Sequence, residues 1–251
     1  HDLNDRNLVF KFLSRFIDIV SGNSKMVVEY LQKQVKVPEN KTICIYNGIQ
    51  TDIKVNHNQN IRHQLNVSPD GFLLGIVGRL VPQKNHAMLF KAVARIYKKQ
   101  PNFKLIVIGD GPRRNELEMM VESLGLSKVI SFLGNRSDVR QLLPVLDLVI
   151  QTSNFEGLPN VIMEAMSAGL PVIATDAGGT KELMVHQETG YLIPCGDENQ
   201  LVKKLSELLK NPLKMQKMGS KGKAYIRQYF SINQLVEKTQ NLYLNLLKNK
   251  A

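Results

Sequence analysis

The chain has 251 residues, of which 43% are hydrophobic and 22% charged, a composition that excludes disorder and suits one large globular domain or two small ones. No apolar run approaches the roughly 20 residues that a membrane-spanning helix needs. The two cysteines, Cys44 and Cys195, lack the spacing of a zinc site, so we expect reduced thiols and a cytoplasmic protein. The net charge of +11 favours nucleic acid, anionic lipid headgroups or phosphorylated small molecules as partners.

The first 70 residues carry a mixed pattern of short elements. We predict a helix over residues 8–16, a strand over 17–20, a helix over 24–34, a strand over 41–46 and a turn at Asn47-Gly48. Residues 49–70 are polar and rich in turn formers. The chain is therefore expected to begin with a small unit over residues 1–48, followed by a linker over residues 49–70.

From residue 72 onward, short apolar runs alternate with amphipathic stretches. The runs are near-continuous, as in strands buried on both faces of a parallel sheet, and we place them at 72–77, 104–108, 129–133, 148–152, 172–175 and 190–193. Helices are expected between them at 86–99, 114–124, 161–168 and 200–209. This alternation predicts an α/β domain over residues 71–228, with a Rossmann-like, doubly wound parallel sheet.

Two further helices are predicted beyond the sheet, at residues 213–229 and 232–247. The second forms a C-terminal helical segment over residues 229–251. Its apolar side chains pack either against the same domain or on something outside it, and they are Leu235, Leu242, Tyr243 and Leu246.

The loop over residues 78–85 joins the first strand of this domain to the next helix. In open parallel sheets, ligands bind beyond the carboxyl ends of the strands, and Gly78 allows the chain to turn sharply there. Arg79 and Lys84 lie at the two ends of the loop. An arginine fork and a lysine point charge suit a diphosphate, although the loop alone is also compatible with two solvated surface cations.

A second candidate segment, residues 156–161 (EGLPNV), follows the fourth strand and opens a helix. Proline suits a helix start, and the free amides there form an anion site. Glu164, roughly one and a half turns into the helix, suits a ribose hydroxyl pair or is an ordinary solvated residue. A glycosidase pair of Glu156 and Glu164 is disfavoured, because such carboxylates lie on opposite sides of the scissile bond.

Three more loops are expected on the same edge of the sheet. They are residues 109–112 (GDGP), 134–138 (GNRSD) and 176–180 (DAGGT). Arg136 and Asp138 either flank a nucleobase or start a helix, and Glu182 either contacts a ligand or is solvated at a helix start. No GxGxxG, HExxH, GxSxG or P-loop motif occurs, which disfavours a dinucleotide enzyme, and no metal ligands are predicted.

Taken together, these motifs resemble those of retaining glycosyltransferases with the GT-B fold, in the family 4 group. The similar stretches, in the order that the family shows, are GRLVPQKN (78–85), IGDGPRRNELE (108–118), FLGNRSDVRQLL (132–143), the run over residues 153–183 and GYLIPCGD (190–197). FIDIVSGNSKMVVEYL and KTICIYNGI resemble the end of the family's first domain and the crossover between its two domains.

The resemblance implies catalytic roles for three residues. Arg79 and Lys84 would neutralise the diphosphate of a nucleotide-sugar and of the leaving nucleotide, with Gly78 in the same loop. Glu156 matches the first glutamate of the family's E-x7-E motif and would position the transferred sugar. Glu164 matches the second and would bind the ribose hydroxyls.

The resemblance also implies donor-binding contacts made by the backbone. The amides around Gly157, Leu158, Asn160 and Val161 would hold the phosphate and the sugar. The backbone near Gly134 and Arg136 would meet the nucleobase.

The implied reaction transfers a sugar from a nucleotide-diphospho-sugar, with UDP as the expected nucleotide, to a glycan or lipid-linked acceptor. No cofactor or metal is needed for it. The net charge of +11 suits peripheral contact with the inner face of an anionic membrane. Only the last fragment of a first GT-B domain precedes the nucleotide domain, so we expect the missing N-terminal domain to be needed for transfer.

Other functions are compatible with the same sequence. The chain is alternatively a non-catalytic nucleotide-sugar-binding subunit that needs a separate acceptor-binding partner. An epimerase or phosphorylase relative of the same fold is a second alternative, and a basic module for membranes or nucleic acid is a third. Nucleic acid is not the expected partner, because no lysine and arginine block is interleaved with aromatic residues.

Overall fold

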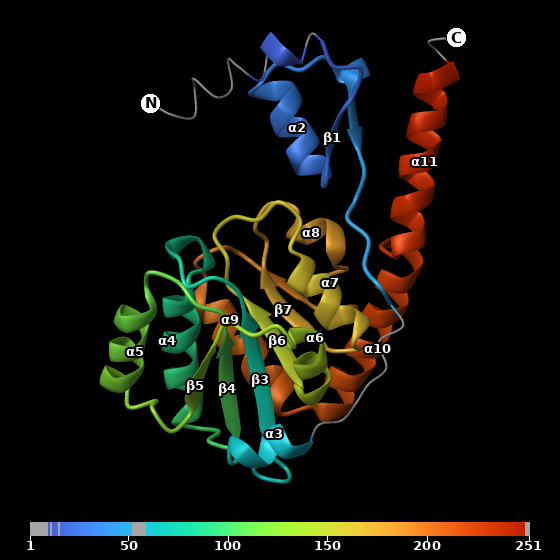
Figure 1. The fold of residues 1–251 in the computed structure, drawn as a ribbon. Helices are drawn as coiled ribbons and strands as arrows, with labels where there is room; N and C mark the ends of the chain where they lie inside the picture. The colour runs from blue at the N-terminus through green and yellow to red at the C-terminus, as the bar shows by residue number, and fades with distance from the viewer. Residues whose placement is uncertain (1–9, 11, 15, 52–58, 249–251) are drawn as a thin grey trace.

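The computed structural model describes residues 10, 12–14, 16–51 and 59–248, and its main body is a six-stranded parallel sheet (Figure 1). The strands are β3 (Phe72–Val77), β4 (Phe103–Ile108), β5 (Ile130–Gly134), β6 (Leu148–Gln151), β7 (Val172–Thr175) and β8 (Tyr191–Ile193). Their order across the sheet is β5-β4-β3-β6-β7-β8, and every neighbouring pair is parallel. The predicted doubly wound sheet is confirmed.

Helices cover both faces of this sheet, as Figure 1 shows. They are α4 (His86–Tyr97), α5 (Arg114–Ser123), α6 (Val139–Leu142), α7 (Asn160–Ser167), α8 (Thr180–Leu183), α9 (Glu198–Leu209) and α10 (Pro212–Tyr229), with short 3-10 turns at Pro82–Lys84 and Leu143–Val145. The four helices predicted between the strands correspond to α4, α5, α7 and α9, so both the element types and their order are confirmed.

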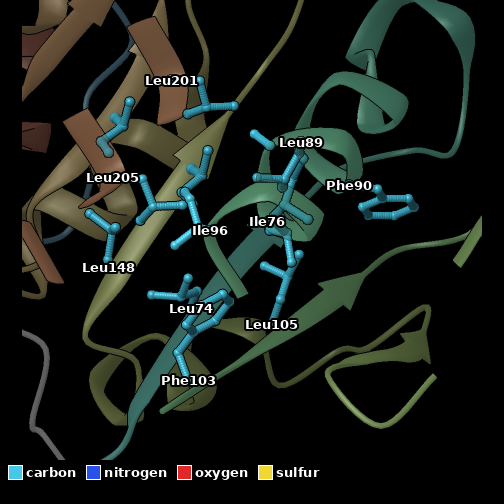
Figure 2. Packing of buried hydrophobic residues seen from close by; sticks show 14 of the residues in the cluster. Leu74, Ile76, Leu89, Phe90, Ile96, Phe103, Leu105, Leu148, Leu201 and Leu205 are labelled. Atoms are coloured by element: carbon cyan, nitrogen blue, oxygen red, sulfur yellow. The ribbon is translucent and has the colours of Figure 1, made fainter. Parts of the chain in front are cut away.

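Two hydrophobic clusters fill the space between the sheet and its helices. Adjacent side chains of β3 point to opposite faces: Leu74 contributes to the cluster under α4, α5 and α9, and Leu73 to the cluster under α6 and α7. Figure 2 shows the first cluster, in which Leu89 of α4 and Leu201 and Leu205 of α9 surround the strands. Burial on both faces explains why the strands read as near-continuous apolar runs.

Before the sheet, the chain forms a small βαβ unit. Its elements are β1 (Val20–Gly22), α2 (Lys25–Lys33), a 3-10 turn at Glu39–Lys41 and β2 (Thr42–Cys44), with β1 and β2 parallel. The predicted helix over 24–34 is confirmed, and Ser24 caps it by accepting from the Val27 amide at 3.1 Å. The strand expected over 17–20 instead spans Val20–Gly22, because pairing with β2 overrides local propensity. Of the predicted helix over 8–16, residues 10, 12 and 13 are helical, and residues 8, 9, 11 and 15 lie outside the described part.

The crossover after β2 runs alongside the last helix, α11 (Ile232–Lys248) (Figure 1). The turn predicted at Asn47-Gly48 is wrong, because this segment continues without a turn. A Cβ atom on Gly48 would lie 2.6 Å from the carbonyl oxygen of Ser231 and 2.9 Å from Cβ of Leu235. Glycine is needed here for the close approach of two segments rather than for a turn.

The stretch assigned to a linker contains a helix in its second half, α3 (Gln59–Gln64). Arg62 donates to the carbonyl oxygens of Gly71 at 2.6 Å and Val145 at 2.8 Å, and it pairs with Asp147 at 2.9 Å. The apolar side chain of Ile61 packs against the second cluster. Polar contacts and one apolar face therefore attach this stretch to the sheet, whereas residues 52–58 lie outside the described part.

The two predicted C-terminal helices are confirmed as α10 and α11. The first turn of α11 approaches the crossover at Gly48, but α11 has no buried residue along its length. Tyr243, Leu244 and Leu247 are 63%, 56% and 66% exposed. Within the described residues, no helix has the length and apolarity that crossing a membrane would require.

Candidate functional site

The side of the sheet to which the chain adds new strands changes between β3 and β6. Strands β4 and β5 are added on one side of β3, and β6, β7 and β8 on the other. Loops that leave two strands at such a switch point diverge and open a crevice at their carboxyl ends, where ligands bind in open α/β sheets. The loop after β3 holds Arg79 and Lys84, and the loop after β6 holds Glu156. The topology therefore brings the three predicted catalytic residues to the same edge of the sheet.

Glycines close the floor of this crevice under Arg79. Gly109 has a φ of +131°, and a Cβ atom on it would lie 2.1 Å from the carbonyl oxygen of Gly78. Gly134 ends β5 with a φ of +66° and accepts a hydrogen bond from the Gly109 amide at 2.8 Å. The loops after three adjacent strands thus meet backbone to backbone, an approach that side chains would block.

A pocket of about 620 Å³ lies above these glycines. Arg79 and Arg136 line it from two different loops, with Gly78 and Asn135 between them. Arg136 pairs with Asp138 at 2.6 Å, whereas Arg79 is exposed and makes no ion pair within the described residues. A second hollow, of about 730 Å³, lies against α10, and no predicted site residue lines it.

Lys84 and Glu156 form an ion pair next to this pocket, with 2.5 Å between Nζ and Oε1. Glu156 is 7% exposed, and its Oε1 also accepts from Gln151 Nε2 at 2.9 Å and from Ser153 Oγ at 2.6 Å. Burial of a carboxylate is costly unless it is paired and hydrogen-bonded, and here it is both. The two predicted catalytic groups thus neutralise each other in the free protein, and Lys84 does not line the pocket of Arg79.

The segment after Glu156 is held by two glycines of the loop after β7. A Cβ atom on Gly178 would lie 2.0 Å from the carbonyl oxygen of Glu156, and one on Gly179 would lie 1.9 Å from that of Gly157. Leu158 is buried beneath this contact at 6% exposure. The 156–158 backbone is therefore fixed from below, which positions the start of α7.

Helix α7 begins at Asn160, one residue earlier than predicted, with Pro159 as its N-cap. Ile162 N donates to the Pro159 carbonyl, and the amides of Asn160 and Val161 face the helix start, where anions are favoured. The Asn160 side chain accepts from Asn47 Nδ2 at 2.9 Å, which connects this helix start to the crossover.

Glu164 lies in the middle of α7 and is half-buried. Its Oε1 accepts from Arg140 Nε of α6 at 3.5 Å. Arg140 belongs to the segment that also carries Arg136 and Asp138, so α6 and α7 approach each other on the Arg136 side of the site. Glu164 and Glu156 have different partners, and within the described residues no hydrogen bond or ion pair joins the two.

Glu182 has a different role from either one expected for it. Its carboxylate accepts from the Lys25 and Met26 amides at 2.9 and 3.1 Å and from Tyr46 Oη at 2.8 Å. Glu182 therefore joins α8 to the start of α2 and to the crossover. Burial and the hydrogen bond to Glu182 raise the pKa of Tyr46 to above its ordinary range.

Sequence reasoning missed four residues that contact the predicted site. Gln151 and Ser153 bond Glu156, Arg140 pairs with Glu164, and Asn47 bonds Asn160. Gln151 and Ser153 lie at the carboxyl end of β6, at the same edge of the sheet as the loop of Arg79 and Lys84. That position could have identified them from the sequence. Arg140 and Asn47 depend on tertiary contacts between distant segments, which no local pattern reveals. Within the described residues, no group of His, Cys, Asp and Glu could hold a metal ion.

Comparison with known proteins places this architecture in a family. A family model described as Glycosyl transferases group 1 matches residues 57–225. The chain is 30% identical over 213 residues, 83% of this chain and 56% of the relative, to the N-acetylgalactosamine-N,N'-diacetylbacillosaminyl-diphospho-undecaprenol 4-alpha-N-acetylgalactosaminyltransferase of Campylobacter jejuni. It is 25% identical over 244 residues, 97% of this chain and 64% of the relative, to the N-acetyl-alpha-D-glucosaminyl L-malate synthase of Bacillus anthracis.

Comparison with solved structures also finds a glycosyltransferase-like fold that binds a nucleotide-sugar in a relative. HepE of Anabaena, solved in complex with UDP-glucose, matches with a TM-score of 0.89 at 29% identity, covering 98% of this chain and 69% of HepE. The chain spans 56% and 64% of the length of the two curated relatives named above. The family match includes every strand of the sheet and the loops of Arg79, Lys84, Glu156 and Glu164. The chain belongs to the glycosyl transferases group 1 family, as the C-terminal domain of a GT-B fold.

Proposed function

We propose that this chain is the donor-binding half of a retaining glycosyltransferase of the family 4 group, which moves a sugar from a UDP-sugar to a glycan or lipid-linked acceptor. One observation carries the proposal: the arginine-lined pocket and the Lys84–Glu156 pair lie side by side at the switch point of the sheet. Cations suit the diphosphate, and the neighbouring carboxylate suits sugar hydroxyls. The complex of HepE with UDP-glucose supports the same class of donor.

The chemistry of such a transfer is mainly electrostatic. When the bond between the sugar and the diphosphate breaks, negative charge grows on the β-phosphate. Arg79 and the first amides of α7 would stabilise that charge more in the transition state than in the ground state. Lys84 would do the same once the diphosphate competes for it with Glu156, and Glu156 would then position the sugar.

The nucleoside would lie toward the Arg136 side of the pocket. In this arrangement Glu164 accepts from the ribose hydroxyls, and the backbone near Gly134 and Arg136 meets the base. Arg140 pairs with Glu164 and would keep that carboxylate directed toward the ribose. No step in this scheme requires a metal or a cofactor.

The acceptor would be bound mainly by residues outside this chain, which spans under two thirds of the length of these curated relatives. We assign residues 71–228 to the donor domain, residues 1–48 to the end of an N-terminal domain with the crossover, and residues 229–251 to a C-terminal helix. The name of the Campylobacter relative contains diphospho-undecaprenol, a lipid-linked substrate. The net charge of +11 suits peripheral contact with the anionic cytoplasmic face of a membrane, where such an acceptor would lie.

Calorimetric titration of UDP, GDP and ADP tests the proposal. We expect UDP to bind and Arg79→Ala to weaken it about 10- to 100-fold, the range for one lost charge-assisted contact. Arg227→Ala is the matched control, because Arg227 is an exposed arginine of α10. The proposal fails if no nucleotide binds, or if the two variants lose affinity equally.

A further inference from the structure

The carboxylate of Glu156 is bonded asymmetrically. All three of its donors, Lys84 Nζ, Gln151 Nε2 and Ser153 Oγ, approach the same oxygen, Oε1, at 2.5, 2.9 and 2.6 Å. A carboxylate oxygen offers about two lone pairs, so Oε1 has no room for another donor. A ligand hydroxyl can bond only the other oxygen, Oε2.

Oε2 is the free half of this carboxylate. Within the described part of the chain no donor bonds it, and it is not among the fully buried polar atoms that lack a partner. The Glu156 side chain keeps 9% of its exposure. Oε2 is therefore the carboxylate oxygen left for a ligand, while Oε1 is held in the protein.

The residues that hold Oε1 are themselves fixed. Gln151 Nε2 also donates to Ser153 Oγ at 3.0 Å, and the Ser153 carbonyl accepts from Thr175 Oγ1 at 2.5 Å. Both side chains are almost fully buried, Gln151 at 2% and Ser153 at 0% exposure. Lys84 alone would leave the direction of the carboxylate open, because an ammonium group is a point charge on a flexible stem. The amide and the hydroxyl fix the direction.

Gln151 also has a structural cost that argues for a role in ligand binding. Among the described residues its Oε1 has no partner although it is buried, whereas buried polar atoms are nearly always hydrogen-bonded. An apolar side chain of the same length at this position would avoid that cost but would lose the bond to Glu156. Groups kept at the expense of stability are typical of functional sites.

We propose that Gln151 and Ser153 are positioning residues, which aim Oε2 of Glu156 at a hydroxyl of the transferred sugar and so give the site its preference for a nucleotide-sugar over the bare nucleotide. This inference rests on the proposed donor-binding function. It separates two tasks within one crevice: the Arg79 pocket holds the nucleotide, and the Gln151–Ser153–Glu156 group reads the sugar.

The test compares UDP-glucose with UDP by calorimetry in the 251-residue chain and in two variants. Gln151→Met keeps the length of the side chain and removes both amide atoms, and Ser153→Ala removes the hydroxyl. In each variant we expect UDP affinity to stay within about twofold, while the ratio of UDP-glucose to UDP affinity falls by about tenfold, a typical loss for one hydrogen bond to a charged group. Thermal unfolding checks that both variants are folded.

Ser167→Ala is the matched control, because Ser167 is a buried serine of α7 whose hydroxyl donates to the Glu164 carbonyl. It should leave the affinity ratio unchanged. An unchanged ratio in both Gln151→Met and Ser153→Ala would overturn the proposal, as would a parallel loss of UDP and UDP-glucose binding with lower thermal stability. Failure of the unmodified chain to bind UDP would instead refute the donor-binding function itself.

Discussion

The chain contains two α/β units, the six-stranded sheet with its helices (the sheet unit) and the βαβ unit from β1 to β2 (the N-terminal unit). Different forces hold the two units in place. In the sheet unit, helices such as α4 and α9 bury whole apolar faces against strands that are covered on both sides. In the N-terminal unit, α2 has no buried residue. Its start is fixed by hydrogen bonds from two backbone amides, those of Lys25 and Met26, to the Glu182 carboxylate. The same local pattern therefore gives a closely packed core in one place and, in the other, a unit attached by hydrogen bonds and by the close approach of Met26 and Ser24 to Gly178 and Gly179.

This difference matters for the site. The sheet unit supplies the strand ends that carry Arg79, Lys84 and Glu156, so the proposed donor site rests on the closely packed part. The N-terminal unit reaches the crevice through Glu182 and through the bond between Asn47 and Asn160. Its contribution should be adjustable, because a few polar bonds are easier to open than a packed core.

The largest expected effect comes from removing a core side chain of the sheet unit. Phe90 of α4 is fully buried, and Phe90→Ala should lower the free energy of unfolding by about 3–5 kcal/mol through lost burial and a cavity. Leu244→Ala, at an exposed position of α11, should change it by less than about 0.5 kcal/mol. Urea denaturation measures both, and equal losses would contradict the account that burial of α4 against the sheet dominates stability.

A buried histidine makes the same core sensitive to acid. His86 is fully buried with both ring nitrogens unpartnered, and burial, with Lys84 and Arg113 nearby, lowers its pKa to about 4. Below its ordinary pKa of about 6.5 the unfolded chain binds a proton that the folded chain does not, so stability falls as the pH drops from about 6.5 to about 4.

We expect this histidine to cost about 2 kcal/mol of stability at pH 5, from about 1.5 pH units at 1.36 kcal/mol each. Urea denaturation at pH 7 and pH 5 should show that loss in the unmodified chain and not in His86→Leu. The exposed His63 provides a control in His63→Gln. If His86→Leu loses as much stability as the unmodified chain, the acid sensitivity has another source.

A smaller, local effect is expected at the junction between the two units. Glu182→Ala removes both acceptors at the start of α2, so the Lys25 and Met26 amides should exchange with solvent about tenfold faster, equivalent to about 1–2 kcal/mol of local stability. Amides of β3 and β4 should keep their rates. Glu188→Ala, which removes an exposed ion pair with Lys221, is the control. Faster exchange throughout the sheet would show that the junction stabilises the whole chain.

The sheet could be predicted from sequence because each of its strands is a short apolar run that ends at a glycine or polar loop. The order of the strands was not predicted, but the rule that ligands bind at the carboxyl ends of parallel strands already placed Arg79 and Glu156 at one edge of the sheet. The errors fall where a tertiary contact overrides a local signal. Gly48 reads as a turn residue but is small because Ser231 approaches it, and α3 lies in a stretch whose polarity suggested a linker.

The site was predicted only in part for a similar reason. Lys84 and Glu156 were each assigned to a ligand, yet in the free protein they pair with each other. Sequence spacing indicates which groups share an edge, but not which of them bond in the absence of substrate. Glu182 shows the same limit, because its partners lie 157 and 156 positions away along the chain.

The most direct test of the central claim is to map where UDP binds. Amide chemical shifts of the isotopically labelled chain would be followed by nuclear magnetic resonance during a UDP titration. The donor site proposed here predicts saturable shifts at Gly78, Arg79, Gly134, Arg136 and Val161, with the exposed half of α11 unchanged. Saturable shifts confined to other surfaces, such as the hollow against α10, would contradict a donor site at the switch between β3 and β6.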